Sequence, residues 1–140
     1  MPTTRSTCPF CAIVAGEDET DVVYRDEAAV AFLDRRPLFP GHVLVVPVRH
    51  VETLPDLDTA DVAPFFIVVQ RISAAVPEAL GSQGTFVAVN NVVSQSVPHL
   101  HVHVVPRTKG DGLRGFFWPR TKYAPGEAAS VADRIRRALA

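Results

Sequence analysis

Three histidines alternate with apolar residues in one short stretch of this chain, from His99 to His103. If the stretch is a strand, the three imidazoles project from one face and the residues between them point into a core. The unperturbed pKa of imidazole lies nearest to neutral pH among the side chains, so histidine serves as nucleophile, proton carrier or metal ligand. Three of the chain's five histidines in this register therefore predict a chemical site.

The central histidine, His101, is the candidate nucleophile. A neutral imidazole nitrogen attacks phosphorus and splits one displacement into two easier ones, while its second nitrogen donates to an acceptor that fixes the ring. Hydroxyl, amide and imidazole groups nearby would assist a leaving group or an oxyanion. The polar candidates are His42, Asn90, Gln95, Ser96 and His103. Without the histidines, the candidates Asn90, Gln95 and Ser96 would be ordinary turn residues.

A metal site is the alternative use of the same strand. His-x-His on a strand also holds zinc or iron, in which case His101 and His103 are ligands of a metal-dependent oxygenase. Such an enzyme loses activity on chelation. The sequence offers no matching carboxylate near these histidines, which places this alternative last.

The pair Cys8 and Cys11 leaves several alternatives open. A thioredoxin-like redox site needs a strand before the pair, and only seven polar residues precede Cys8. Two thiolates need two further ligands for structural zinc, and His50 and His99 are available. Two inert reduced thiols are the third alternative.

The elements that must position these residues form a mixed pattern. Strands are predicted at 22–25, 30–34, 42–47 and 85–89, and a fifth contains the histidines and ends at Pro106. Helices are predicted over 59–80, with Asp58 as N-cap, Gly81 as stop and a kink at Pro64, and over 127–139. Short connections between strands, with the helices apart, favour an antiparallel α+β sheet.

Composition bounds the class of protein. The 140 residues fit one domain, and 47% hydrophobic with 21% charged residues is ordinary for a globular chain. A formal net charge of -1 gives no general field for nucleic acid or membrane binding. The apolar run 65–69 is short for a bilayer. With two cysteines and no signal peptide, we expect a cytoplasmic protein.

The complete pattern resembles the histidine triad (HIT) family of nucleotidyl hydrolases and transferases. His-apolar-His-apolar-His-apolar-apolar at 99–105 is the signature of that family. The segments 8–17, 31–34, 41–47 and 89–97 are similar to its bacterial members, and Pro106-Arg107 follows the triad. The resemblance covers most of the chain, with residues 8–108 as the core of a single domain 1–140 and 109–140 as a variable tail.

The resemblance implies a role for each matching residue. His101 would attack the α-phosphate, His103 would contact the phosphate, His42 would support them, and Ser96 would help the leaving group. Asp34 would bind ribose hydroxyls of a purine nucleotide. The implied nucleotide site comprises Phe10, Phe32, Asp34, Arg35, Asn90, Ser94, Gln95, Ser96, His101 and His103. As in several bacterial members, Cys8, Cys11, His50 and His99 would hold a structural zinc, and the chemical step itself would need no metal.

The implied fold is a five-stranded antiparallel sheet with helices packed on it, paired into a two-fold homodimer. The implied reaction releases a nucleoside monophosphate from a phosphoramidate or a dinucleoside polyphosphate. A non-catalytic purine-nucleotide-binding regulatory module is the alternative. Ser94 stands where many members have glycine and Pro98 where an aromatic residue is common, which affects the geometry of the phosphate loop.

Overall fold

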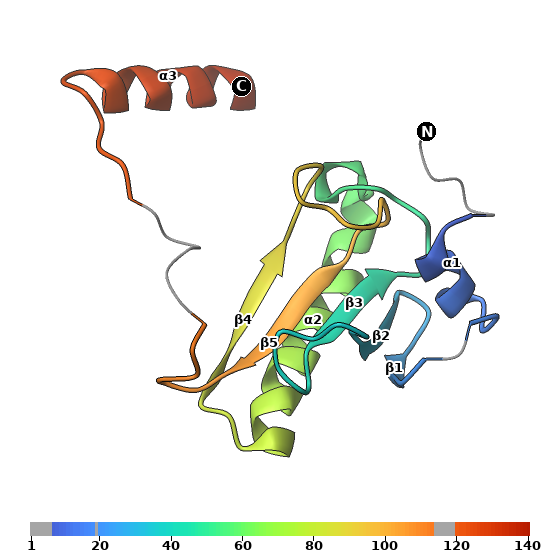
Figure 1. Ribbon diagram of the computed structural model, residues 1–140. Coiled ribbons are helices and arrows are strands. Elements are labelled where there is room, and N and C mark those ends of the chain that lie inside the picture. The colour runs from blue at the N-terminus through green and yellow to red at the C-terminus, as the bar shows by residue number, and fades with distance from the viewer. Residues whose placement is uncertain (1–6, 19, 114–119) are drawn as a thin grey trace.

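The computed structural model describes residues 7–18, 20–113 and 120–140, and its centre is an antiparallel sheet (Figure 1). The strand order is β1-β2-β3-β5-β4, with every neighbouring pair antiparallel. The strands are β1 (Val22–Arg25), β2 (Ala29–Leu33), β3 (Val43–Pro47), β4 (Gly84–Val89) and β5 (Val102–Arg107). The helices are α1 (Pro9–Val14), the 3-10 turn η1 (Leu54–Asp56), α2 (Thr59–Leu80) and α3 (Glu127–Leu139). The predicted α+β class is confirmed.

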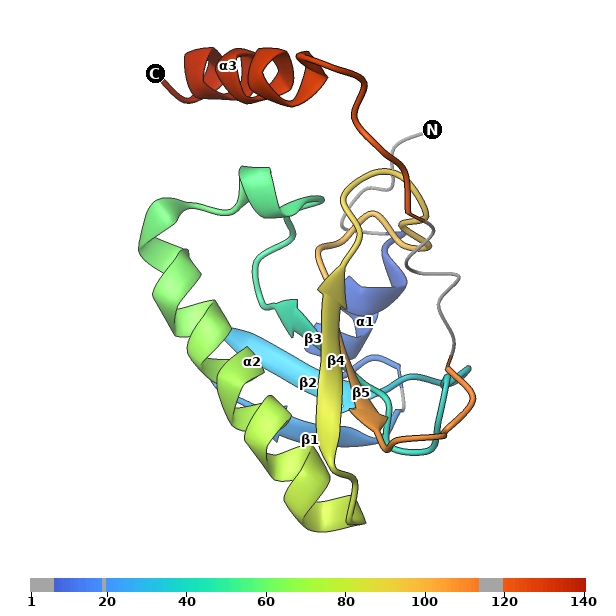
Figure 2. The same ribbon diagram turned by 90° about the vertical axis from the view of Figure 1, so that its left-hand side faces the viewer.

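The central strands are apolar on both faces because helices cover both. Ala31 pairs with Val45, and these residues belong to the core beneath α2. Their neighbours Phe32 and Leu44 also pair, and they pack with α1 on the opposite face. Successive residues of a strand point to opposite faces, so one strand supplies two apolar cores. The sheet is therefore a middle layer, with α2 across one face (Figure 2) and α1 on the other.

The long helix α2 is the main cover of the sheet. Asp58 stands at the N-cap position, but its carboxylate pairs with Arg49 at 2.6 Å instead of capping the helix. Gly81 ends the helix in the left-handed conformation, as predicted. The helix runs from Thr59 to Leu80 through both Pro64 and Pro77. By length and composition alone it would suit a membrane span, but its buried stripe packs in the core against the sheet.

The strand of the histidines begins later than its alternation predicts. We expected it to contain His99 and His101, but β5 begins at Val102. The N–H of His99 donates to the Val97 carbonyl, and the N–H of Leu100 donates to Val51. This main-chain pairing holds residues 99 and 100 against neighbouring loop residues. The predicted division of faces is nevertheless correct, because Leu100, Val102 and Val104 all lie in the core beneath α2.

The last helix, α3, lies apart from the sheet in both views (Figures 1 and 2). Its predicted apolar face exists, but none of its residues is buried, and Ile135 and Leu139 are 56% and 81% exposed. It therefore contributes little to the cores described above. The division into a core at 8–108 and a variable tail stays a prediction.

The packing of α2 predicts that truncating a buried and an exposed apolar side chain of this helix will lower the free energy of unfolding by different amounts. Phe65 is 1% exposed in the core, whereas Ile67 is 54% exposed. We expect Phe65→Ala to lower the free energy of unfolding by about 3–5 kcal/mol, because it removes buried contacts and leaves a cavity. Ile67→Ala should cost less than about 1 kcal/mol. Urea unfolding followed by circular dichroism measures both, and equal costs would contradict the core assignment of α2.

Candidate active site and metal centre

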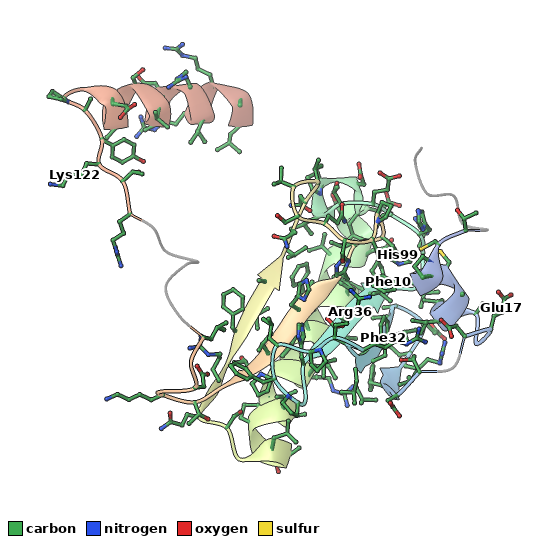
Figure 3. The ribbon with its side chains drawn as sticks, viewed as in Figure 1. Phe10, Glu17, Phe32, Arg36, His99 and Lys122 are labelled. Carbon is green, nitrogen blue, oxygen red and sulfur yellow. The ribbon has the colours of Figure 1, made fainter. Side chains whose placement is uncertain are left out.

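The three triad histidines divide between two clusters. His99 lies against the two cysteines, whereas His101 and His103 line a cavity of about 290 Å³ on the sheet face that carries α1. Phe10 of α1 separates the clusters, with its ring centroid 6.0 Å from His99 and 5.1 Å from His101. Figure 3 labels Phe10 and His99 where α1 meets the sheet, and it labels Phe32 and Arg36, which line the same cavity as Phe10.

His101 is held as a nucleophile requires. Its Nδ1 lies 2.8 Å from the main-chain oxygen of His99. Because a carbonyl oxygen only accepts, Nδ1 carries the proton and Nε2 keeps the lone pair in the neutral ring. The side chain is 3% exposed, and the edge-on ring of Phe10 covers it. His101 therefore presents an unprotonated, oriented imidazole nitrogen.

A chain of hydrogen bonds also fixes the protons of His42 and His103. The Leu38 N–H donates to His42 Nδ1 at 3.0 Å, so neutral His42 carries its proton on Nε2. His42 Nε2 lies 2.9 Å from His103 Nδ1 and donates to it. The proton of neutral His103 is then on Nε2. This arrangement makes His103 a hydrogen-bond donor for an anionic oxygen.

The site favours neutral imidazoles. Burial lowers the pKa of His101 and of His42 below the ordinary value of 6.5. Burial, together with the neighbouring His101 and His42, lowers the pKa of His103 to about 4. Asp34 opposes these shifts but does not reverse them. All three rings are therefore uncharged at neutral pH.

Asp34, which the resemblance assigns to the ribose, also supplies a carboxylate close to the histidines, where the metal alternative found no match in the sequence. Its Oδ2 lies 3.7 Å from His42 Nε2, and its Oδ1 accepts the Arg36 N–H at 2.9 Å. Asp34, His42 and His103 thus resemble a set of metal ligands. The Leu38 N–H opposes that use, because it occupies the lone pair of His42 Nδ1 and leaves a proton on the nitrogen that faces the cluster.

The walls of the cavity suit a nucleoside. Apolar side chains from α1, β2 and β3 line the cavity together with Asp34. Arg35, another lining residue, forms an ion pair with Asp18 at 3.0 Å. One carboxylate is able to accept two vicinal hydroxyls, and an apolar wall accepts a base. The lining includes Phe10, Ile13, Phe32, Leu44, Ser96 and Val97.

The second cluster fits a tetrahedral zinc ion. Cys11 Sγ lies 3.1 Å from His50 Nδ1, and the His99 Nδ1 lies 3.4 and 3.5 Å from the sulfurs of Cys8 and Cys11. Ordinary Zn–S and Zn–N bonds place sulfur and nitrogen ligands about 3.6 Å apart. His99 Nε2 donates to the Pro47 carbonyl at 2.9 Å, which leaves the lone pair on Nδ1. The ligand atoms, their spacing and the His99 tautomer all suit the metal.

The HIT domain family matches residues 15–110. The chain belongs to this family. An uncharacterized HIT-like protein of Methanocaldococcus jannaschii is 40% identical over 107 residues, covering 75% of this chain and 82% of that protein. A crystal structure of SMU.412c from Streptococcus mutans has a TM-score of 0.90 at 30% identity, over 100% of this chain and 90% of the other. A zinc-bound histidine triad protein of Mycobacterium smegmatis has a TM-score of 0.74 at 34% identity, over 96% and 99%.

Two similar HIT relatives carry enzyme names. The asymmetrical bis(5'-nucleosyl)-tetraphosphatase of Schizosaccharomyces pombe is 34% identical, over 66% of this chain and 52% of that protein. The adenylylsulfatase of Arabidopsis thaliana is 35% identical, over 79% of this chain and 57% of that protein. The HIT family therefore includes hydrolases of dinucleotide polyphosphates and of adenylylsulfate.

Most of the residues that we predicted to bind the nucleotide line the cavity, and the others are not among its lining residues. Gln95 Nε2 donates to the Glu52 carbonyl at 2.5 Å, and Asn90 Nδ2 donates to the Ser94 carbonyl. Ser94 has a φ of 62°, which explains why glycine suits this position in the family. The contacts of Gln95 and Asn90 with phosphate, and the place of Ser94 in the nucleotide site, stay predictions.

Sequence reasoning missed a second group of residues beside His103. Arg36, Leu38 and Phe86 line an adjoining cavity with Asn90 and His103. Phe86 would have been found from alternation along β4 once its pairing with β5 was known. No sequence signal indicates that the Leu38 N–H holds His42, because a main-chain donor is present in every residue except proline.

The metal cluster predicts zinc bound at about one ion per chain. Elemental analysis after growth with zinc should find it in the unmutated protein, with both thiols protected from a thiol reagent until a chelator is added. Cys11→Ser should lose the zinc, because it replaces a thiolate with a weak ligand. His42→Ala, outside the cluster, should keep it. Zinc-free protein with freely titratable cysteines would contradict this assignment.

Proposed function

We propose that this HIT protein hydrolyses nucleotides at the α-phosphorus through a covalent nucleotidyl intermediate on His101. The single observation that carries the proposal is the hydrogen bond of His101 Nδ1 to its own chain at His99. This bond leaves Nε2 as the nucleophilic nitrogen. Relatives named as a tetraphosphatase and an adenylylsulfatase support nucleotide hydrolysis as the reaction class.

The proposed reaction has two displacements at phosphorus. In the first, the lone pair of His101 Nε2 forms a bond to phosphorus, and the bond to the leaving group breaks with its electron pair going to the departing atom. The departing atom takes up a proton. In the second, water attacks the phosphorus and loses a proton, the N–P bond breaks, and the electron pair returns to His101. The products are a nucleoside monophosphate and the protonated leaving group.

The surrounding residues have distinct parts in this proposal. His103 donates its Nε2 proton to a phosphoryl oxygen, and His42 holds His103 in that tautomer. Ser96, which lines the cavity, assists the leaving group. Asp34 accepts the ribose hydroxyls while Phe10 and Phe32 contact the base. The purine preference and the contributions of Arg35 and Asn90 belong to the same proposal.

Zinc has a structural part in the proposal. Cys8, Cys11, His50 and His99 would hold it, and its chemistry there is to fix α1 beside the triad. His99 then links the metal cluster to the nucleophile, because its main-chain oxygen orients His101. A homodimer and a cytoplasmic location stay predictions.

The proposed nucleophile predicts loss of turnover without loss of binding. We expect His101→Ala to reduce AMP release from adenosine 5'-phosphoramidate and from diadenosine tetraphosphate by about 1,000-fold or more, because no other group forms the adduct. Gln70→Ala, an exposed change on α2, is the matched control. AMP affinity measured by calorimetry should change much less than turnover.

A covalent adduct gives a second measurement of the same prediction. Quenching the reaction in alkali should trap a labelled nucleotidyl-protein in the unmutated chain and none in His101→Ala. Turnover that survives the substitution would disprove the mechanism. An unmutated protein that binds AMP but hydrolyses neither substrate would favour the regulatory binding module.

Burial of the triad predicts an acid-tolerant reaction. With the pKa of His103 lowered to about 4, that ring stays neutral as the pH falls below 6.5, and burial lowers the pKa of His42 and of His101 in the same direction. An unperturbed histidine would be about 90% protonated at pH 5.5. We therefore expect kcat/KM at pH 5.5 to stay within about twofold of its value at pH 7. A profile that falls with an apparent pKa near 6.5 would contradict the neutral state of these rings.

A further inference from the structure

The two cysteines of the metal cluster are also placed to bond to each other. Cys8 is the N-cap of α1, and the N–H of Cys11 in the first turn donates to Cys8 Sγ at 3.4 Å. The two sulfurs are not joined in a disulfide, and they lie within 4.8 Å of each other. Residues three apart in a helical turn have Cα atoms about 5 Å apart. Disulfides span Cα distances of roughly 4.4–6.8 Å, so rotation of the side chains is enough to close one here.

A cavity of about 520 Å³ gives access to this pair of cysteines. It borders both Cys8 and Cys11, and it shares none of its described lining residues with the nucleoside cavity. Cys8 is 2% exposed, whereas Cys11 is only partly buried. Hydrogen peroxide is small and uncharged, so it reaches Cys11 first, and Cys8 is the neighbouring sulfur that completes a disulfide. The other lining residues are Ala12, Val14, Ala15, Glu17 and Val48.

Oxidation of the pair would change the connection between α1 and the triad. His99 Nδ1 lies 3.4 and 3.5 Å from the two sulfurs, and the main-chain oxygen of His99 accepts from His101. A zinc ion with four ligands cross-links the start of α1 to His50 and His99, whereas a disulfide links the first turn of α1 only to its own N-cap. Because zinc binds thiolates and a disulfide carries no negative charge, oxidation removes two of the four ligands. Phe10 lies between the cysteines, with its ring 5.1 Å from that of His101, so it depends on the same cross-link.

We propose that Cys8 and Cys11 are an oxidisable pair, and that a peroxide converts them to a disulfide, releases the zinc and loosens α1 from the triad. The inference rests on the structural zinc of the proposed function. It adds a chemical modification of the metal ligands that acts on the nucleoside cavity from the opposite side of α1's cysteine pair.

The proposed oxidation has two steps. In the first, the Cys11 sulfur attacks one oxygen of the peroxide, an S–O bond forms, the O–O bond breaks, and the departing hydroxide takes up a proton. In the second, the Cys8 sulfur attacks the Cys11 sulfur, the S–S bond forms, the S–O bond breaks, and a second hydroxide leaves and takes up a proton. The two sulfurs lose two electrons and hydrogen peroxide gains them, so the products are one disulfide, two waters and free zinc.

Hydrogen peroxide treatment of the zinc-loaded protein tests the pair. Zinc release is followed with a chromogenic chelator, and the tryptic peptide 6–25, which contains both cysteines of the chain and no methionine, is weighed. We expect about one zinc per chain to leave and the peptide to become about 2 Da lighter, without a covalent dimer on a non-reducing gel. Dithiothreitol with added zinc should restore the starting state.

The loosening of α1 has its own measurement. In the oxidised protein, the amide hydrogens of α1 should exchange about tenfold faster or more, because a helix of six residues has little stability without its cross-links. The amides of α2, which packs in the core on the other face of the sheet, are the internal control. AMP release from adenosine 5'-phosphoramidate should fall about tenfold or more, because Phe10 no longer packs against His101.

Cys11→His is the matched variant. It keeps a nitrogen ligand where the sulfur stood, and it leaves the chain with one thiol, so no disulfide forms within the chain. Since the remaining Cys8 is buried, the same peroxide treatment should leave the zinc content, α1 exchange and turnover of this variant within about twofold of their untreated values.

Three results would overturn the inference while leaving the proposed hydrolysis intact. They are retention of zinc in peroxide, formation of sulfinic acid in place of the disulfide, and loss of zinc with unchanged exchange in α1. A protein that carries no zinc after growth with the metal would overturn the zinc assignment and the inference together. Reduced, zinc-loaded protein that releases no AMP would instead overturn the proposed hydrolysis, and the zinc and exchange measurements would still decide the inference.

Discussion

The buried side chain and main chain of His99 hold the two halves of the site together. Its Nε2 donates to the last residue of β3, its Nδ1 faces the thiols of Cys8 and Cys11, and its carbonyl oxygen accepts from His101. The side chain is 0% exposed, so any displacement would leave polar groups buried without partners. One residue thereby fixes α1, the end of a central strand and the proposed nucleophile.

The position of α1 has consequences for the chemistry because this helix carries Phe10. Its ring packs edge-on against His101 and Phe32 and closes the apolar side of the nucleoside cavity. A helix of six residues has little stability alone. The Cys8, Cys11, His50 and His99 cluster compensates by tying both the helix start and its first turn to the sheet. The proposed zinc therefore acts on the active site through position, and burial of the triad then keeps the imidazoles neutral.

The sequence predicted the sheet and the residues at the site better than it predicted their orientation. Period-two apolar patterns placed the strands to within one residue, except at the histidines, where loop residues accept the hydrogen bonds of the His99 and Leu100 N–H groups. The cysteine-histidine cluster assembled as the resemblance implied. By contrast, the partners of Gln95 and the donor to His42 are main-chain groups, which no side-chain pattern reveals. The face carrying Phe86 depends on cross-strand register, which is a tertiary property.

Main-chain atoms, rather than the side chains of the cavity walls, set the proton positions of the site. The proton positions of His42, His101 and His103 depend on main-chain atoms of Leu38 and His99, so substitutions in the cavity walls leave those positions in place. Leu38 shows this separation within one residue, since its N–H orients His42 while its side chain lines the adjoining cavity. Phe86 likewise reaches that cavity from β4, the edge strand of the sheet, without contributing to the triad's hydrogen bonds. The same proton positions are thus compatible with different side chains in the cavity walls.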